Sequence, residues 1–224
     1  MTLYPININI RDRLCVVVGG GRVAARKVVS LLGSGAVVKV ISPRICPKIE
    51  TLEQQQRLEL VRRQYQSGDL TGACLVFAAT DRAKVQQKIL DEAGKRSLLI
   101  NVADSPERCT FQIPASLKRE DLLITVSTGG GSPLLAATIR EELERRYGEE
   151  YGVLVRLLAA LRVQLLELDL PGVNRKKVFK KLLSLNILGL MQTHHRDQLR
   201  ALLEAELPEQ VDINAVLDSR ENNE

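Results

Sequence analysis

A short apolar run followed at once by a glycine turn constrains the fold of this chain more than any other feature. Leu14 to Val18 indicates a buried parallel strand, because five successive apolar residues suit a strand that is covered on both faces. The next residues, Gly19 to Ala24, match the pattern G-x-G-x-x-G/A, and a helical pattern follows them. A dinucleotide-binding fingerprint requires this order of strand, turn and helix. The sequence therefore predicts a dinucleotide site here; the alternative is a glycine turn in an α/β domain without a ligand.

Each small residue of this turn is expected at its position for a physical reason. Gly19 allows a tight turn, Gly21 lets the backbone approach a pyrophosphate, and Ala24 lets the helix pack closely on the strand. The free N–H groups and the positive dipole end of the helix then face the phosphates. The predicted cofactor-binding residues of the turn are Gly19, Gly20, Gly21, Arg22, Val23 and Ala24.

Composition bounds the class of protein. With 224 residues, of which 45% are hydrophobic, the chain suffices for one large domain or for a domain and a smaller one. Aromatic residues make up 3% and Trp is absent, which argues against a stacking platform for single-stranded nucleic acid. No apolar run approaches the roughly 20 residues of a membrane-spanning helix, and the first residues lack a basic stretch followed by a long apolar one, so we expect neither a membrane span nor a secretory signal. We expect neither nucleic acid nor a membrane as partner.

Cysteine spacing and charge add two expectations. The spacing of Cys15, Cys46, Cys74 and Cys109 fits no metal finger, so we expect a reducing, cytoplasmic setting and no bound metal. The net charge is +5, and the whole excess lies in residues 1–150, which indicates an anionic partner. An acidic small molecule together with a dinucleotide accounts for this charge as well as nucleic acid does.

The first half of the chain alternates strands and helices. This alternation predicts an α/β fold with an open, mostly parallel, Rossmann-type sheet, in which ligands bind beyond the carboxyl ends of the strands. Residues 1–12 alternate apolar and polar side chains like a short edge segment. The predicted strands cover residues 14–18, 37–41, 57–62, 73–79 and 97–102. Three helices are predicted: the first begins near residue 22 and ends at Gly33 or Gly35, and the other two cover 45–55 and 82–94.

Polar residues follow the second and fourth strands. The acidic residue that normally holds the adenosine ribose is missing after the second strand, where the sequence offers Ser42, Pro43 and Arg44. Ser42 suits a ribose hydroxyl and Arg44 suits a 2′-phosphate, so the residues leave NAD and NADP both open. After the fourth strand, Asp81 is predicted to cap the next helix. The predicted cofactor-binding residues beyond the glycine turn are Ser42, Pro43, Thr80 and Asp81.

Asp104 follows the fifth strand and is the best candidate for a catalytic carboxylate. The carboxyl ends of parallel strands meet at one edge of the sheet, so Asp104 is expected near the glycine turn. The alternative is an aspartate that only forms the turn before Ser105-Pro106. The residues alone leave these two interpretations even.

The pattern changes after residue 110. Two strand-like runs, 110–114 and 122–127, flank the charged stretch 118–121 and predict a hairpin. The loop 127–132 then opens a helix over 133–147, with Ser132 as the N-cap, and is either a second anion site or a flexible connector.

The remainder of the chain is predicted to be helical, over 151–168, 178–190 and 198–207. The basic cluster at 175–181 indicates a solvated face, and the alternative is a surface that meets carboxylates of a substrate or partner. His194 and His195 are interpreted as surface residues because no further ligands accompany them.

Together these motifs resemble a known family. The chain resembles the precorrin-2 dehydrogenase / sirohydrochlorin ferrochelatase family, the module also found as the N-terminal half of fused siroheme synthases, in its stand-alone form. The residues that carry the resemblance are Tyr4-Pro5, Leu14 to Lys27, Ala78 to Asp81, Asn101 to Asp104, Phe111, Ile113 to Ala115 and Val126 to Pro133.

The resemblance implies a three-part organisation and a homodimer. Its parts are a Rossmann domain over 1–112, a small α+β dimerisation segment over 113–148 and a helical domain over 149–224. It implies NAD-dependent oxidation of precorrin-2 to sirohydrochlorin, with Fe²⁺ insertion in some relatives. The acidic tetrapyrrole would suit the basic first part of the chain.

The resemblance also implies roles for particular residues. Asp104 matches the acidic residue that is proposed to act in the chemistry, and the implied substrate-binding residues are Ser127, Thr128, Gly129 and Gly130. Thr128 stands where some relatives carry a serine, which puts a regulatory role of that hydroxyl in doubt. Two rival functions remain: a non-catalytic dinucleotide sensor and a dehydrogenase for another acidic substrate.

Overall fold

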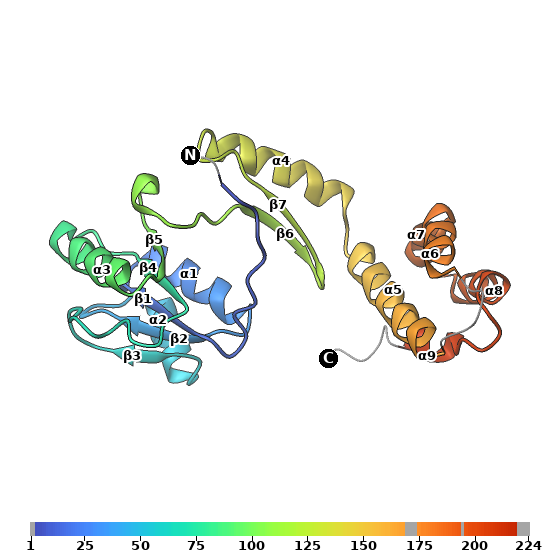
Figure 1. Ribbon diagram of the computed structural model, residues 1–224, viewed down its shortest axis with the longest axis horizontal. Coiled ribbons are helices and arrows are strands. Elements are labelled where there is room, and N and C mark those ends of the chain that lie inside the picture. The colour runs from blue at the N-terminus through green and yellow to red at the C-terminus, as the bar shows by residue number, and fades with distance from the viewer. Residues whose placement is uncertain (1–2, 169–173, 194, 219–224) are drawn as a thin grey trace. The chain divides into compact units, whose positions relative to one another are not determined.

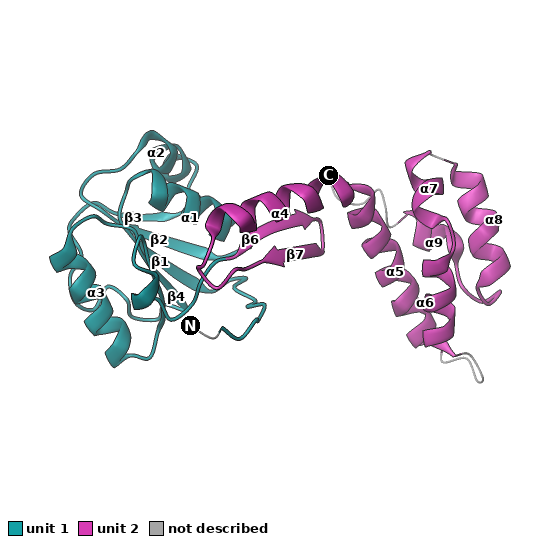
Figure 2. Ribbon diagram, turned by 90° about the horizontal axis from the view of Figure 1, so that it is seen from above, with its two compact units in different colours: residues 1–113 teal, residues 114–224 magenta. Residues whose placement is uncertain are grey.

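The computed structural model describes residues 3–168, 174–193 and 195–218. It divides into two compact units, residues 1–113 and 114–224 (Figure 2). The finer division of the second part at residue 148 stays a prediction. Among the described residues, no helix has both the length and the apolar character needed to cross a membrane.

Unit 1 is built on a five-stranded parallel sheet in the order β3-β2-β1-β4-β5 (Figure 1). This order is that of a Rossmann-type half and confirms the predicted fold class. The strands are β1 (Leu14–Val18), β2 (Val37–Ile41), β3 (Glu59–Val61), β4 (Leu75–Ala78) and β5 (Leu99–Val102). The helices are α1 (Arg22–Leu32), α2 (Pro47–Gln54), α3 (Ala83–Lys95) and the short 3₁₀ helix η1 (Pro106–Arg108).

The two faces of β1 explain its continuous apolar run. Cys15 and Val17 are fully buried in a core shared with α1 and α2, whereas Val16 and Val18 are buried in a second core with Ile89 of α3. A strand covered by helices on both sides has no solvent face that needs polar residues. At about 25 cal/mol per Å² of apolar surface, this double burial is a main source of stability for unit 1.

Unit 2 contains an antiparallel hairpin and a group of helices. The strands are β6 (Ala115–Arg119) and β7 (Leu122–Val126). The helices are α4 (Pro133–Arg146), α5 (Glu150–Glu167), α6 (Arg175–Ser184), α7 (Ile187–Gln192), α8 (Arg196–Glu206) and α9 (Ile213–Asp218).

Three predicted elements were wrong in detail. Residues 110–114 do not form the first hairpin strand, because Thr110 bonds back to β5: its N–H donates to the Ile100 carbonyl at 2.9 Å and its Oγ1 accepts from the Ile100 N–H at 2.8 Å. The predicted helix 178–190 is broken at Leu185, which lets Leu182 and Ile187 enter one core. Residues 3–10 form no strand.

Candidate active site

A cavity of about 1080 Å³ lies at the carboxyl edge of the sheet in unit 1. This volume is at the upper end for ligand pockets, which suits a ligand as large as a dinucleotide. All five strands contribute residues that follow their carboxyl ends. The lining residues include Gly19, Gly20, Gly21, Arg22 and Val23 after β1, Ser42, Pro43 and Arg44 after β2, Gln64 and Tyr65 after β3, Thr80, Asp81 and Arg82 after β4, and Asp104 after β5.

The three glycines of the turn are needed for three different reasons. Gly19 has φ +132°, and a Cβ there would lie 2.1 Å from the Ala79 carbonyl oxygen, so this position accepts only glycine. A Cβ on Gly20 would lie 2.0 Å from the Arg44 carbonyl oxygen. A Cβ on Gly21 would meet nothing within 4 Å, so open space lies beside the backbone where a pyrophosphate would approach.

Helix α1 presents its N-terminus without a side-chain cap. Gly21 is the N-cap residue, and its carbonyl accepts from the Ala25 N–H at 3.0 Å. The first N–H groups of a helix have no partner within the helix, so they are available to an anion. Ala24 is fully buried behind the turn and does not line the cavity; its role is the close packing of helix on strand.

The loop after β2 is fixed by its own hydrogen bond. The hydroxyl of Ser42 donates to the Arg44 carbonyl at 2.6 Å, and Ser42 is buried. The ribose contact predicted for Ser42 therefore depends on the lone pairs of its oxygen. Pro43 and Arg44 are exposed and line the cavity, and the lining residues of this loop include no acid.

The predicted helix cap at Asp81 is wrong. Helix α3 begins at Ala83, and Arg82 occupies the N-cap position without a side-chain cap. Thr80 organises this turn instead: its Oγ1 accepts from the Arg82 N–H at 3.3 Å, and its carbonyl accepts from Gln86 Nε2 at 2.6 Å. The carboxylate of Asp81 is exposed at the cavity.

Asp104 both forms a turn and lines the cavity. Its φ of +59° lies in the left-handed region, which aspartate tolerates better than most residues. The turn is tied to β4 by the Ala103 N–H, which donates to the Ala78 carbonyl at 3.0 Å. Beneath it, Cys109 Sγ accepts from the Val102 N–H at 3.1 Å and lies 3.3 Å from the Ser105 carbonyl. The carboxylate is therefore exposed on an anchored turn, and its catalytic role stays a prediction.

The predicted substrate loop lies in unit 2. Gly129 and Gly130 have φ of +62° and +86°, and the Gly129 N–H donates to Ser127 Oγ at 3.2 Å. The Thr128 hydroxyl donates to the Ser132 carbonyl and accepts from the Ser132 N–H, both at 3.1 Å. Thr128 therefore shapes the loop.

The predicted N-cap of α4 is confirmed, because Ser132 Oγ accepts from the Leu135 N–H at 3.2 Å. His195 is exposed, with Nδ1 2.6 Å from Thr193 Oγ1, and His194 lies outside the described residues. In the described part of the chain, no group of three or more His, Cys, Asp or Glu residues is placed to hold a metal ion.

Sequence reasoning missed part of the cavity wall. Gln64 and Tyr65 follow the short strand β3, and no motif marks them. Exposed arginines come from three separate segments, Arg22, Arg44 and Arg82, and they make the cavity attractive to a pyrophosphate. Arg22 and Arg44 were predicted, at the glycine turn and after the second strand, whereas Arg82 was not; the net positive charge of the first half of the chain was the available signal for it.

The fold and the cavity define a dinucleotide-binding protein of the Rossmann type. A family model described as "Putative NAD(P)-binding" matches residues 6–115, and one described as "Sirohaem biosynthesis protein central" matches residues 119–146. Both matches support the resemblance of this chain to the precorrin-2 dehydrogenase / sirohydrochlorin ferrochelatase family. Its cofactor is thus a nicotinamide dinucleotide.

Individual relatives agree with this assignment. A siroheme synthase of Thioalkalivibrio sulfidiphilus is 33% identical over 208 residues, which are 92% of this chain and 42% of the relative. One of Methylobacillus flagellatus is 40% identical over 162 residues, or 72% of this chain and 35% of the relative. The chain therefore spans less than half the length of these synthases. A solved structure of a precorrin-2 dehydrogenase matches with a TM-score of 0.70 and 27% identity, covering 86% of this chain and 98% of that one.

Proposed function

We propose that this protein oxidises precorrin-2 to sirohydrochlorin with NAD in siroheme biosynthesis. The observation that carries the proposal is the single cavity along all five strand ends, with the carboxylate of Asp104 at the β5 end. In this fold the adenosine ribose lies beside the end of β2 and the pyrophosphate at the turn after β1. The nicotinamide half is then directed toward β4 and β5, where Thr80 and Asp104 line the cavity.

The chemistry requires a base near the reacting ring. When bound, the cofactor supplies a hydride acceptor, and the oxidation of the macrocycle also releases a proton. The carboxylate of Asp104 accepts that proton in our proposal, because it is the acidic side chain at the β5 end of the cavity.

NAD, rather than NADP, is the cofactor in this proposal. The resemblance to the family supports NAD. Arg44, which lies beside the adenosine end of the cavity, would instead favour the 2′-phosphate of NADP. Dissociation constants for both dinucleotides test this choice: NAD is expected to bind more tightly, and tighter binding of NADP would reverse it.

Unit 2 is proposed to supply the dimer interface and substrate contacts. Leu134 and Leu135 at the start of α4 are 78% and 51% exposed, and Leu123 of β7 is 47% exposed. Exposed large apolar side chains of this kind mark interaction surfaces, and a two-stranded hairpin is only marginally stable alone. We propose a homodimer through residues 113–148, with the loop 127–130 contacting carboxylates of the tetrapyrrole.

Fe²⁺ insertion is a second activity to be tested. It would release two pyrrole protons, for which Asp104 is again the available acceptor, and Fe²⁺ would be a substrate. No specific metal ligand set in the described residues favours this activity, so the dehydrogenase reaction carries the proposal.

An anaerobic assay tests both activities. Purified protein is mixed with precorrin-2 and NAD, and the visible spectrum is followed before and after Fe²⁺ is added. We expect NAD-dependent formation of sirohydrochlorin that stops when precorrin-2 is consumed. Iron insertion faster than in a protein-free control would add the chelatase activity. NAD binding without any turnover would instead support a dinucleotide sensor or a dehydrogenase for another acidic substrate.

A further inference from the structure

The loop between β3 and β4 forms one wall of the cavity. Strand β3 lies at the opposite edge of the sheet from β5, after which Asp104 stands. Gln64 and Tyr65 line the cavity from this loop. The loop begins beside the turn after β2, where the Ser42 N–H donates to the Val61 carbonyl at 3.1 Å. Since the adenosine ribose of a bound dinucleotide lies beside that turn, this wall faces the adenosine half of the cofactor.

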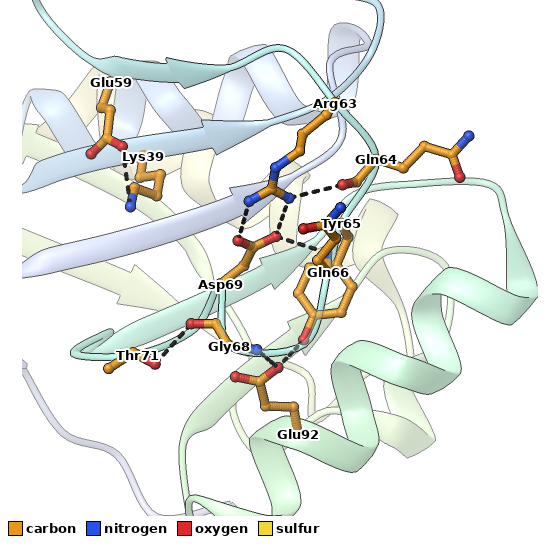
Figure 3. A network of polar contacts seen from close by, with 10 residues as sticks. All are labelled: Lys39, Glu59, Arg63, Gln64, Tyr65, Gln66, Gly68, Asp69, Thr71 and Glu92. Carbon is orange, nitrogen blue, oxygen red and sulfur yellow. Dashed lines mark hydrogen bonds and ion pairs between the residues drawn. The ribbon is translucent and has the colours of Figure 1, made fainter.

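A buried carboxylate on α3 anchors this wall (Figure 3). Glu92 is 9% exposed, and its Oε2 accepts from the Tyr65 hydroxyl at 2.5 Å and from the Gly68 N–H at 2.8 Å. Its Oε1 lies 3.1 Å from Arg96 Nε. Burial by itself raises the pKa of Glu92, but the hydrogen bonds from Tyr65 and Gly68 and the charge of Arg96 outweigh it, so the pKa is lowered. Glu92 therefore remains an anion that joins the loop to the helix.

A second contact closes the loop on itself. The guanidinium of Arg63 donates to both carboxylate oxygens of Asp69, at 2.6 and 2.7 Å, and the Gln66 N–H donates to Asp69 Oδ2 at 2.8 Å. A two-point contact of this kind fixes orientation as well as distance. Figure 3 shows the amide of Gln64 extending away from this network. Gln64 is exposed and lines the cavity.

We propose that Glu92 and Tyr65 are positioning residues that hold the adenosine-side wall of the cofactor site, and that Gln64 contacts the adenine edge. Tyr65 is buried between the sheet and α3, so its ring is a fixed surface, and its hydroxyl bond to Glu92 sets where Gln64 lies. A carboxamide has both donors and acceptors and suits the adenine edge. The inference rests on the proposed function only in that it needs the cavity to bind NAD.

The test separates binding of the adenosine half from turnover. Tyr65→Phe and Glu92→Gln are titrated with NAD and with ADP, which carries only the adenosine half, by isothermal titration calorimetry. We expect each variant to weaken both ligands by a similar factor of about 10, because binding must then also order a wall that the wild type already holds in place. In the dehydrogenase assay, KM for NAD rises by the same factor while kcat and KM for precorrin-2 stay unchanged.

The opposite kinetic pattern would overturn the inference. A fall in kcat at unchanged KM for NAD would mean that the network only stabilises the fold and lowers the active fraction. If the two variants fail to fold, Gln64→Ala replaces them: this exposed side chain is expected to matter for ADP affinity and not for the melting temperature. Unchanged ADP affinity in Gln64→Ala would equally count against the proposal.

A matched control lies in the same part of the molecule. Glu59→Gln removes the ion pair with Lys39, 3.1 Å across β2 and β3, and Glu59 does not line the cavity. This variant should bind ADP like the wild type. If the wild type itself binds no dinucleotide, the proposed function fails; if it binds NAD and ADP but Tyr65→Phe does so equally well, only the present inference fails.

Discussion

The two ends of the cavity in unit 1 are built differently. At the β3 end, the wall is anchored by the buried anion Glu92 and by a bidentate Arg63–Asp69 pair. At the β5 end, Asp104 is exposed on a left-handed turn, which backbone contacts and the thiol of Cys109 hold in place. The difference indicates that binding and chemistry make separate demands. A wall that only binds gains from fixed geometry, whereas a carboxylate that accepts a proton must remain open to substrate and solvent.

Removing the base should have the largest effect. Asp104→Asn is expected to lower kcat by a factor of about 10² to 10⁴, the usual contribution of a positioned general base, while the dissociation constant for NAD stays within about twofold of wild type. Steady-state kinetics and calorimetric titration measure the two quantities. The control is Asp81→Asn, the other acidic side chain that lines the cavity. Full turnover in Asp104→Asn would show that the β5 end does not supply the base, and so that chemistry and binding are not assigned to separate ends.

Two glycine variants in the turn after β1, which lies between the two ends of the cavity, distinguish an effect on packing from an effect on ligand binding. Gly20→Ala places a methyl group 2.0 Å from the Arg44 carbonyl oxygen, whereas Gly21→Ala places one in open space. Gly20→Ala should lose about 1–3 kcal/mol of stability through overpacking. Gly21→Ala should keep its melting temperature but bind NAD more weakly. Thermal melts and NAD titrations compare the pair, and equal losses of stability would contradict this account.

Loosening the turn at the β5 end should change turnover more than cofactor binding. Cys109→Ala removes the sulfur that accepts from the Val102 N–H and lies beside the Ser105 carbonyl. We expect kcat to fall by about 10-fold, equivalent to about 1.4 kcal/mol of transition-state stabilisation, at unchanged KM for NAD. At the β3 end the opposite is expected, a higher KM for NAD at unchanged kcat. A rise in KM for NAD without a change in kcat would erase the distinction between the two ends.

Acid should weaken the β3 end gradually, which is the smallest expected effect. The hydrogen bond from Arg63 lowers the pKa of Asp69, and the pKa of Glu92 is lowered as well. Because these folded-state pKa values lie below the unfolded ones, the stabilisation is present above about pH 4 and is lost as the pH falls through the folded values. Urea unfolding followed between pH 7 and pH 3 should show this loss, with a shallower decline in Glu92→Gln. An identical decline in that variant would exclude Glu92 as a source.

Sequence patterns identified the elements that depend on neighbouring residues. The strands β1 and β2 have the predicted bounds, because a run of apolar residues between turn signals is a local property. The same reasoning located the turn residues at the strand ends, including Asp104, since the topology of a parallel sheet brings carboxyl ends to one edge. It failed at Asp81, where the hydroxyl of Thr80 competes for the same turn.

By itself, the sequence determined the Rossmann-type sheet, the glycine turn and the chemical type of the cofactor, because periodicity and glycine spacing act over short stretches of chain. Only the tertiary structure decided why Gly20 must be a glycine and what holds the adenosine-side wall. The contact of Gly20 with Arg44 and that of Tyr65 with Glu92 join residues far apart in the chain. Such contacts depend on how strands and helices pack in three dimensions, and no local pattern records them.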